Sequence, residues 1–250
     1  MDGLLILMIL ILIPIPIMTK YMLGGKNPYR GLLEGILSAI IGVIMVFVFS
    51  QAFTGLTIFE RLDTILNNVS IADMNMSRTY EIFGLSKLDS SELETAMENM
   101  KEIMKLSIPG TIIVWASILS YVNYKTVSWL LYKSGKEVSM LPPFRDFSLP
   151  KSVMLGSILI YIFSYLAANM GLIDKDLIMF NIQMMFKFIF SIQGLAFIFY
   201  FGYIKRVPQL LTLIIVAVLI TTGIGKTILF IVGLTDIALD IRKRILLKQA

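Results

Sequence analysis

The run "LLTLIIVAVLITTGIGKTILFIVGL", Leu210–Leu234, decides the class of fold, because it carries one charged residue, Lys226, in an otherwise apolar stretch. About 20 apolar residues in a helix cross a hydrocarbon core of roughly 30 Å. Five further apolar runs precede it: Leu4–Met18, Gly31–Phe53, Ile108–Leu131, Val153–Met170 and Leu177–Phe201. The sequence therefore predicts an all-α protein, a polytopic membrane helix bundle of about six transmembrane helices.

The composition supports this class. Hydrophobic residues make up 57% of the chain, and only 16% of residues are charged, against about 25% in soluble domains. The apolar runs are continuous, whereas a membrane β-barrel needs short segments of alternating polarity. The net charge of +5 suits anionic lipid headgroups better than nucleic acid, since no basic patch is interleaved with aromatic residues.

The chain contains no cysteine and no histidine. Their absence removes disulfides, thiolate chemistry and the usual general base at neutral pH. Histidine is also the commonest metal ligand. We therefore expect a protein that is not an enzyme, with no catalytic residue, no metal and no cofactor.

The charges between the apolar runs predict a topology. We expect a single integral membrane domain over residues 1–250, with an outer polar loop at 60–107, an inner loop at 133–151 and a basic tail at 235–250. Lys20, Lys26 and Arg30 predict a cytoplasmic first loop, whereas nine acidic and five basic residues place Glu60–Lys105 outside. Such charge asymmetry is typical of a multi-pass protein of the cytoplasmic membrane.

The tail conflicts with that pattern. Six crossings from an outside start would place Arg242, Lys243 and Arg244 outside, where the positive-inside rule disfavours them. A break at Gly223–Gly225 would instead fold Leu210–Ile241 into two half-helices and return the tail to the cytoplasm. Each half is too short to span unless it is buried in protein, so both alternatives stay open.

The outer loop contains "SELETAMENMKEIMKL", which predicts an amphipathic helix. Ser91 is a candidate N-cap, and Leu93, Met97, Met100 and Met104 recur at helical spacing. The helix is expected to cover its own protein at the membrane surface, with a lid over a binding site as the alternative.

The segment "GIGKT" ends like a phosphate-binding P-loop, but that motif needs a glycine where this chain has Ile220. Lys226 is therefore interpreted as an intramembrane charge, which usually faces the bundle interior and has a partner. Lys187 is a second such charge, and Gln183 and Ser191 lie on the same helical face as Lys187.

At about 15 Å and 12 Å from the ends of their segments, Lys187 and Lys226 can face one cavity. With Gln183 and Ser191 they form the candidate ligand site, suited to an anionic small molecule that carries a carboxylate or phosphate. The alternative is that each lysine snorkels, or pairs with a helix carbonyl or an acid such as Asp236.

Two further segments have structural and functional interpretations. Gly31, Gly35, Ser38 and Gly42 form a small-residue stripe that favours close helix packing.

The inner segment "MLPPFRDFSLPK" is stiffened by prolines that oppose a helix through its middle. It is interpreted as a structural turn or as a docking surface for a cytoplasmic partner, through Pro143, Phe144, Arg145, Asp146 and Pro150.

The order of "KNPYRGLLEG", "LPPFRDFSLP" and "GLTDIALDIRKR" resembles the YybS-like predicted membrane proteins of Firmicutes, a family of unknown function. The resemblance covers nearly the whole chain. Positions that fall on the family pattern are Pro143, Arg145, Pro150, Gly233 and the tail motif Asp236, Asp240 and Arg242. Family members generally begin with further apolar helices, so the resemblance implies that this chain lacks its N-terminal helices.

That family is distantly similar to the substrate-binding S components of energy-coupling-factor transporters, which are six-helix vitamin binders. The similarity implies a small-molecule pocket, with a membrane scaffold and cytoplasmic ATPases as partners. The expected function is a solute-binding membrane subunit of a transport system. The alternative is a non-transporting scaffold or regulator that recruits cytoplasmic partners.

Overall fold

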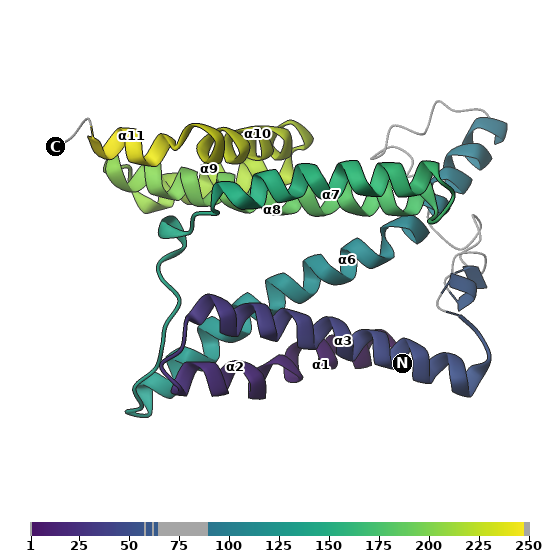
Figure 1. Cartoon of the computed structure of the whole chain (residues 1–250), viewed down its shortest axis with the longest axis horizontal. Helices are drawn as coiled ribbons and strands as arrows, with labels where there is room; N and C mark the ends of the chain where they lie inside the picture. Colours follow the sequence, from purple (N-terminus) through teal and green to yellow (C-terminus); the bar gives the residue numbers. More distant parts are fainter. Residues whose placement is uncertain (1, 58, 62, 65–89, 248–250) are drawn as a thin grey trace. The chain divides into compact units, whose positions relative to one another are not determined.

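The computed structural model describes residues 2–57, 59–61, 63–64 and 90–247, and its principal elements are all helices (Figure 1). Among these residues, five helices are long and apolar enough to cross a membrane, or six if a bent pair of helices counts as one span. The predicted class, an all-α polytopic membrane protein, is confirmed. The chain folds into two compact units, Met1–Ser139 and Met140–Ala250, which are described in turn; their union in one membrane domain stays a prediction.

In the described part of the first unit, four helices pack together, and the first, third and fourth of them share a small apolar core. These helices are α1 (Asp2–Leu12), α2 (Pro14–Leu23), α3 (Pro28–Thr54) and α6 (Ser90–Lys133). The chain breaks between α1 and α2 because proline has no N–H to continue the helix. At this break, Asn123 of α6 donates from Nδ2 to the carbonyl oxygen of Ile11, at 2.8 Å. Together the two pieces form one candidate span, Ile6–Leu23.

The small-residue stripe on α3 packs as predicted. Gly31, Gly35 and Gly42 are buried, and a Cβ on Gly35 would lie 2.0 Å from the side chain of Met18. The absence of a side chain at Gly35 lets the Met18 side chain of α2 pack directly on the backbone of α3.

The amphipathic helix of the outer loop is present, but it is not a separate element. It forms the first turns of α6, which continues without a break through Pro109 to Lys133. The prediction of a distinct surface helix was therefore wrong about where that helix ends, because it does not stop before the apolar run. Residues 62 and 65–89 of the predicted outer loop lie outside the described residues.

The second unit contains a loop, two long helices and a bent pair. A 3-10 turn, η2 (Phe144–Asp146), precedes α7 (Lys151–Asn169) and α8 (Lys175–Ile204). The turn forms between the prolines, with the Asp146 N–H donating to the Pro143 carbonyl at 2.9 Å. The prolines thus exclude an α-helix from this segment but not a single 3-10 turn.

The last apolar run is broken into two helices, which is one of the two alternatives that the sequence left open. Helix α9 (Gln209–Thr221) ends and α10 (Gly223–Leu239) begins at an angle of 109°. The break lies at Thr222, whose extended backbone caps α10 while its side chain accepts from the N–H of Gly225 at 3.1 Å. Gly225 allows the bend, because a Cβ there would lie 2.4 Å from the Leu219 carbonyl oxygen.

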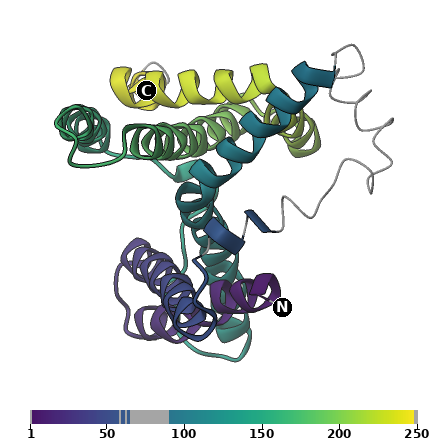
Figure 2. The same ribbon diagram turned by 90° about the vertical axis from the view of Figure 1, so that its right-hand side faces the viewer.

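The contacts with α8 show that the broken pair is a hairpin. Just after the turn from α8, Thr212 of α9 packs on Gly202. Farther along, Phe230 of α10 contacts Phe190, and the chain then returns until Arg242 lies over Tyr200. Helix α11 (Ile241–Leu247) is thereby brought to the end of α8 from which α9 departs. In Figures 1 and 2 the yellow ribbons of α10 and α11 lie against the green ribbons of α8 and α9.

Candidate functional site

Helices α8 and α10 meet at two glycines. A Cβ on Gly233 would lie 1.8 Å from the carbonyl oxygen of Phe190, and one on Gly194 would lie 2.1 Å from that of Leu229. Neither contact tolerates a side chain, so the two backbones touch at this crossing. This close approach brings polar side chains on the neighbouring turns of the two helices within bonding distance.

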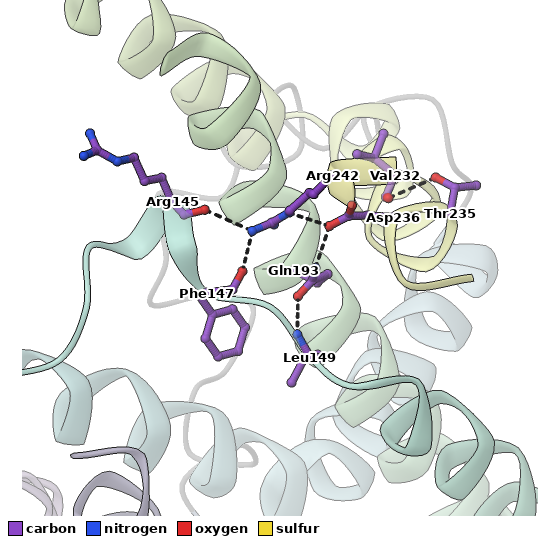
Figure 3. A network of polar contacts seen from close by, with 8 residues as sticks. All are labelled: Arg145, Phe147, Leu149, Gln193, Val232, Thr235, Asp236 and Arg242. Atoms are coloured by element: carbon purple, nitrogen blue, oxygen red, sulfur yellow. Dashed lines mark hydrogen bonds and ion pairs between the residues drawn. The ribbon is translucent and has the colours of Figure 1, made fainter. Parts of the chain in front are cut away.

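Gln193 and Asp236 form a buried pair beside that crossing. Gln193 is fully buried and Asp236 is 4% exposed. The Gln193 amide donates from Nε2 to Oδ2 of Asp236 at 2.6 Å, and its Oε1 accepts from the N–H of Leu149 at 2.9 Å. Gln193 therefore joins α10 to the loop that precedes α7 (Figure 3).

Arg242 completes the network. Its Nε donates to Oδ2 of Asp236 at 2.9 Å, and its Nη1 donates to the carbonyl oxygens of Arg145 and Phe147 at 3.0 and 2.8 Å. The guanidinium neutralises the buried carboxylate and holds the loop backbone at the same time (Figure 3). Asp240 turns the chain toward the loop by adopting a left-handed conformation with φ of 49°.

Aromatic rings of α8 surround this network. The guanidinium of Arg145 lies 3.8 Å from the ring centroid of Tyr203, and Phe144 packs edge-on against Phe199. The predicted stiff hook is thus anchored to the end of α8 by a cation–π contact and ring packing.

A second ion pair lies on the surface of the same region. Lys151, the first residue of α7, donates from Nζ to Oδ2 of Asp240 at 2.6 Å. The hydrogen bond from Lys151 lowers the pKa of the Asp240 carboxyl, and the positive charges of Lys151, Lys243 and Arg244 lower it further. Partial desolvation of the carboxyl opposes this shift.

Two residues of the predicted tail motif contact the inner loop or α7 directly: Arg242 bonds the loop backbone, and Asp240 bonds α7. Asp236 and Arg242 belong to the buried network, and Asp240 pairs with Lys151. The alternative in which Lys226 pairs with Asp236 is not what the described residues show: the Asp236 carboxylate instead bonds Gln193 and Arg242. Sequence reasoning missed Gln193; its signal is an amide beside a glycine inside an apolar run.

The four predicted ligand-site residues lie on α8 and α10. Lys187, Gln183 and Lys226 are exposed and Ser191 is half-buried. Lys187 lies one turn before Phe190 on α8, and Lys226 lies one turn before Phe230 on α10. The rings of the two phenylalanines contact each other. The two helices run in the same sense there, so both lysines lie on the same side of that contact. A role in binding stays a prediction.

The five predicted docking residues divide into two groups. Phe144 and Arg145 are half-buried and engaged with α8. Pro143, Asp146 and Pro150 are exposed on a backbone that the network holds in place. Within the parts of the chain that the structure describes, no group of three or more metal-ligating side chains is present.

The family model described as "Predicted membrane protein (DUF2232)" matches residues 1–237. A curated relative, "Uncharacterized protein YybS" of Bacillus subtilis (strain 168), is 24% identical over 224 residues, which cover 88% of this chain and 70% of the relative. No solved structure matches.

Proposed function

Because the chain belongs to the DUF2232 family of predicted membrane proteins, we propose that it is a subunit of the cytoplasmic membrane that binds a small anionic solute for a transport system. The resemblance of the YybS-like proteins to transporter S components favours this class. In this proposal the chain binds and releases its solute without covalent chemistry of its own. A membrane scaffold and cytoplasmic ATPases are its partners.

One observation carries the proposal: two lysines lie within apolar helices that pack together, and neither has an ion pair among the described residues. A lysine near the centre of a membrane helix costs about 2.5–3.5 kcal/mol on insertion scales. Lys187 and Lys226 incur that cost on the same side of the Phe190–Phe230 contact. A carboxylate or phosphate bound between them would offset it.

The neighbouring polar groups suit the same ligand. Gln183 and Ser191 lie one turn before and one turn after Lys187 on α8, so an amide and a hydroxyl accompany the charge along one face. Gly223, at the start of α10, has nothing within 4 Å of a Cβ placed on it, so the backbone there is open to close approach near Lys226.

The test replaces each lysine by methionine, which keeps the length of the side chain and removes its charge. The purified chain is screened for ligand-induced thermal stabilisation against a panel of small carboxylates and phosphate esters. We expect Lys187→Met and Lys226→Met each to weaken binding at least tenfold. Lys175→Met, at the start of the same helix, is the matched control and should bind as the wild type does. Unchanged binding in both variants would overturn the proposal.

The exposed loop residues favour a second candidate, a scaffold or regulator. Pro143, Asp146 and Pro150 are exposed on a backbone held by Arg242 and Gln193, and a preorganised loop binds a partner at a lower entropic cost. If Asp146→Arg abolished co-purification of a cytoplasmic protein while ligand binding was retained, this candidate would be preferred.

A further inference from the structure

The buried network gathers four segments of the second unit at one end of α8. Arg242 bonds the loop backbone at Arg145 and Phe147, and Lys151 at the start of α7 pairs with Asp240. Arg145 in turn lies over Tyr203, near the end of α8. The loop, the start of α7, the end of α8 and α11 therefore share one face, which we call the basic end.

The exposed charges of the basic end are mostly positive. Lys205 and Arg206 follow α8, and Lys243 and Arg244 lie on α11; all four are exposed. None of them has an ion pair among the described residues. Two acids lie nearby, but each already has a cation: Asp240 pairs with Lys151 at 2.6 Å, and Asp146 lies 3.9 Å from Arg145.

Apolar and aromatic side chains adjoin these charges. Phe201 is 43% exposed, Tyr203 61% and Leu210 71%, and all three flank Lys205 and Arg206 in the chain. A charged rim beside exposed apolar surface matches the boundary between headgroups and acyl chains, where aromatic residues are enriched.

We propose that the basic end binds the anionic headgroups of phospholipids in the leaflet that it faces. The four cations without an ion pair supply the charge that complements phosphate, and the adjoining rings and leucine supply the contact with acyl chains. An acidic soluble protein would complement the cations but would leave the apolar side chains without a partner. The inference requires only that the helices are embedded in a membrane, so it is independent of any solute site.

Lipid selectivity is tested with the full chain in nanodiscs of phosphatidylcholine mixed with phosphatidylglycerol. After gentle extraction in detergent, mass spectrometry measures the ratio of the two lipids that remain with the protein. The test variant carries Lys205→Gln, Arg206→Gln, Lys243→Gln and Arg244→Gln. A variant that exchanges lysine and arginine at the same four positions is the matched control.

Each cation near an anionic surface contributes to attraction within a Debye length. We therefore expect the wild type and the exchange control to retain phosphatidylglycerol preferentially, and the glutamine variant to lose at least tenfold of that preference. Equal retention by the glutamine variant would overturn the proposal. Displacement of the lipid by inorganic phosphate alone would also overturn it, because the site would then be one for a soluble anion.

Two checks separate lipid binding from folding and from protein binding. The glutamine variant should unfold at the same temperature as the wild type in phosphatidylcholine alone. If it does not fold, Lys243→Gln with Arg244→Gln, away from the left-handed turn at Arg206, should still reduce the preference. Loss of an acidic protein partner with unchanged lipid selectivity would contradict the proposal.

Discussion

Arg242 is the residue whose removal should change this structure most. It bonds the buried carboxylate of Asp236 and two loop carbonyls, and its own side chain is only 11% exposed. Replacement by methionine, which is similar in length, removes the charge and all three hydrogen bonds. The perturbation is Arg242→Met.

The loss of stability in this variant comes from the Asp236 carboxylate, which stays buried without its cation. The Asp236 side chain is 2% exposed, so without the guanidinium it becomes a buried charge with only Gln193 as a donor. Breaking a buried ion pair from one side costs about 3–5 kcal/mol. For a chain of this size, about 2–4 °C of melting temperature is lost per kcal/mol, which predicts a decrease of about 6–20 °C.

Two matched variants make the test specific. Arg244→Met removes an exposed arginine of the same helix and should cost less than about 0.5 kcal/mol. Asp236→Asn combined with Arg242→Met removes the uncompensated charge and keeps an acceptor for Gln193. The double variant should therefore be more stable than Arg242→Met alone.

Thermal unfolding and hydrogen exchange are the assays. The amide of Leu149, which donates to Gln193, should exchange faster in Arg242→Met because the loop is no longer held by α11. If Arg242→Met is as stable as Arg244→Met, or if the added Asp236→Asn brings no recovery, the buried ion pair does not stabilise the fold.

Three further variants test the backbone contacts and the surface ion pair. Gly233→Ala places a methyl group 1.8 Å from a carbonyl oxygen of α8, so it should cost about 1–3 kcal/mol in thermal unfolding, whereas Gly223→Ala, with nothing within 4 Å, should not. Gly225→Ala meets a carbonyl of α9 at 2.4 Å and should open the bend, measurable as a longer spin-label distance across the hairpin; a distance equal to that in Gly223→Ala would contradict this account. The pKa of Asp240 is lowered in the fold, so its contribution to stability is present above the unfolded pKa of 3.8 and is lost as pH falls through the folded value. Lys151→Met should reduce this loss in acid titrations of unfolding, and an unchanged titration would show that the pair has no effect.

The sequence predicted the parts of this fold that depend on composition and local pattern. Apolar runs predicted the membrane class, and the glycines of 31–42 predicted a packing stripe because both signals lie within one helix. The break in the last run was one of two alternatives, and the structure places it at Thr222, one residue before the expected glycines.

The network could not be predicted in the same way. Arg242 bonds a loop 95 and 97 residues earlier in the chain, and no periodicity encodes such a pairing. The sequence offered only the two lysines as partners for Asp236, whereas the turn at Asp240 brings Arg242 to it instead. The family resemblance did point to Arg145, Asp236 and Arg242, but it did not say that they contact one another.

The continuous helix α6 also differs from the prediction, because packing between helices far apart in the sequence outweighs a local signal. We expected the polar outer-loop helix to be separate from the apolar run Ile108–Leu131, yet α6 continues from one into the other through Pro109. Proline in a helix interior removes one backbone hydrogen bond, a local cost that packing against α3, α2 and α1 offsets.

Single cysteines show whether the α9–α10 hairpin returns the tail to the side of the inner loop. The chain has no cysteine of its own, so Ser148→Cys, Leu172→Cys and Arg244→Cys each introduce one reporter at an exposed position. A membrane-impermeant maleimide is applied to right-side-out and to inverted vesicles. Positions 148 and 244 should be labelled from the same side, and position 172 from the other. Labelling of position 244 together with position 172 would contradict this topology.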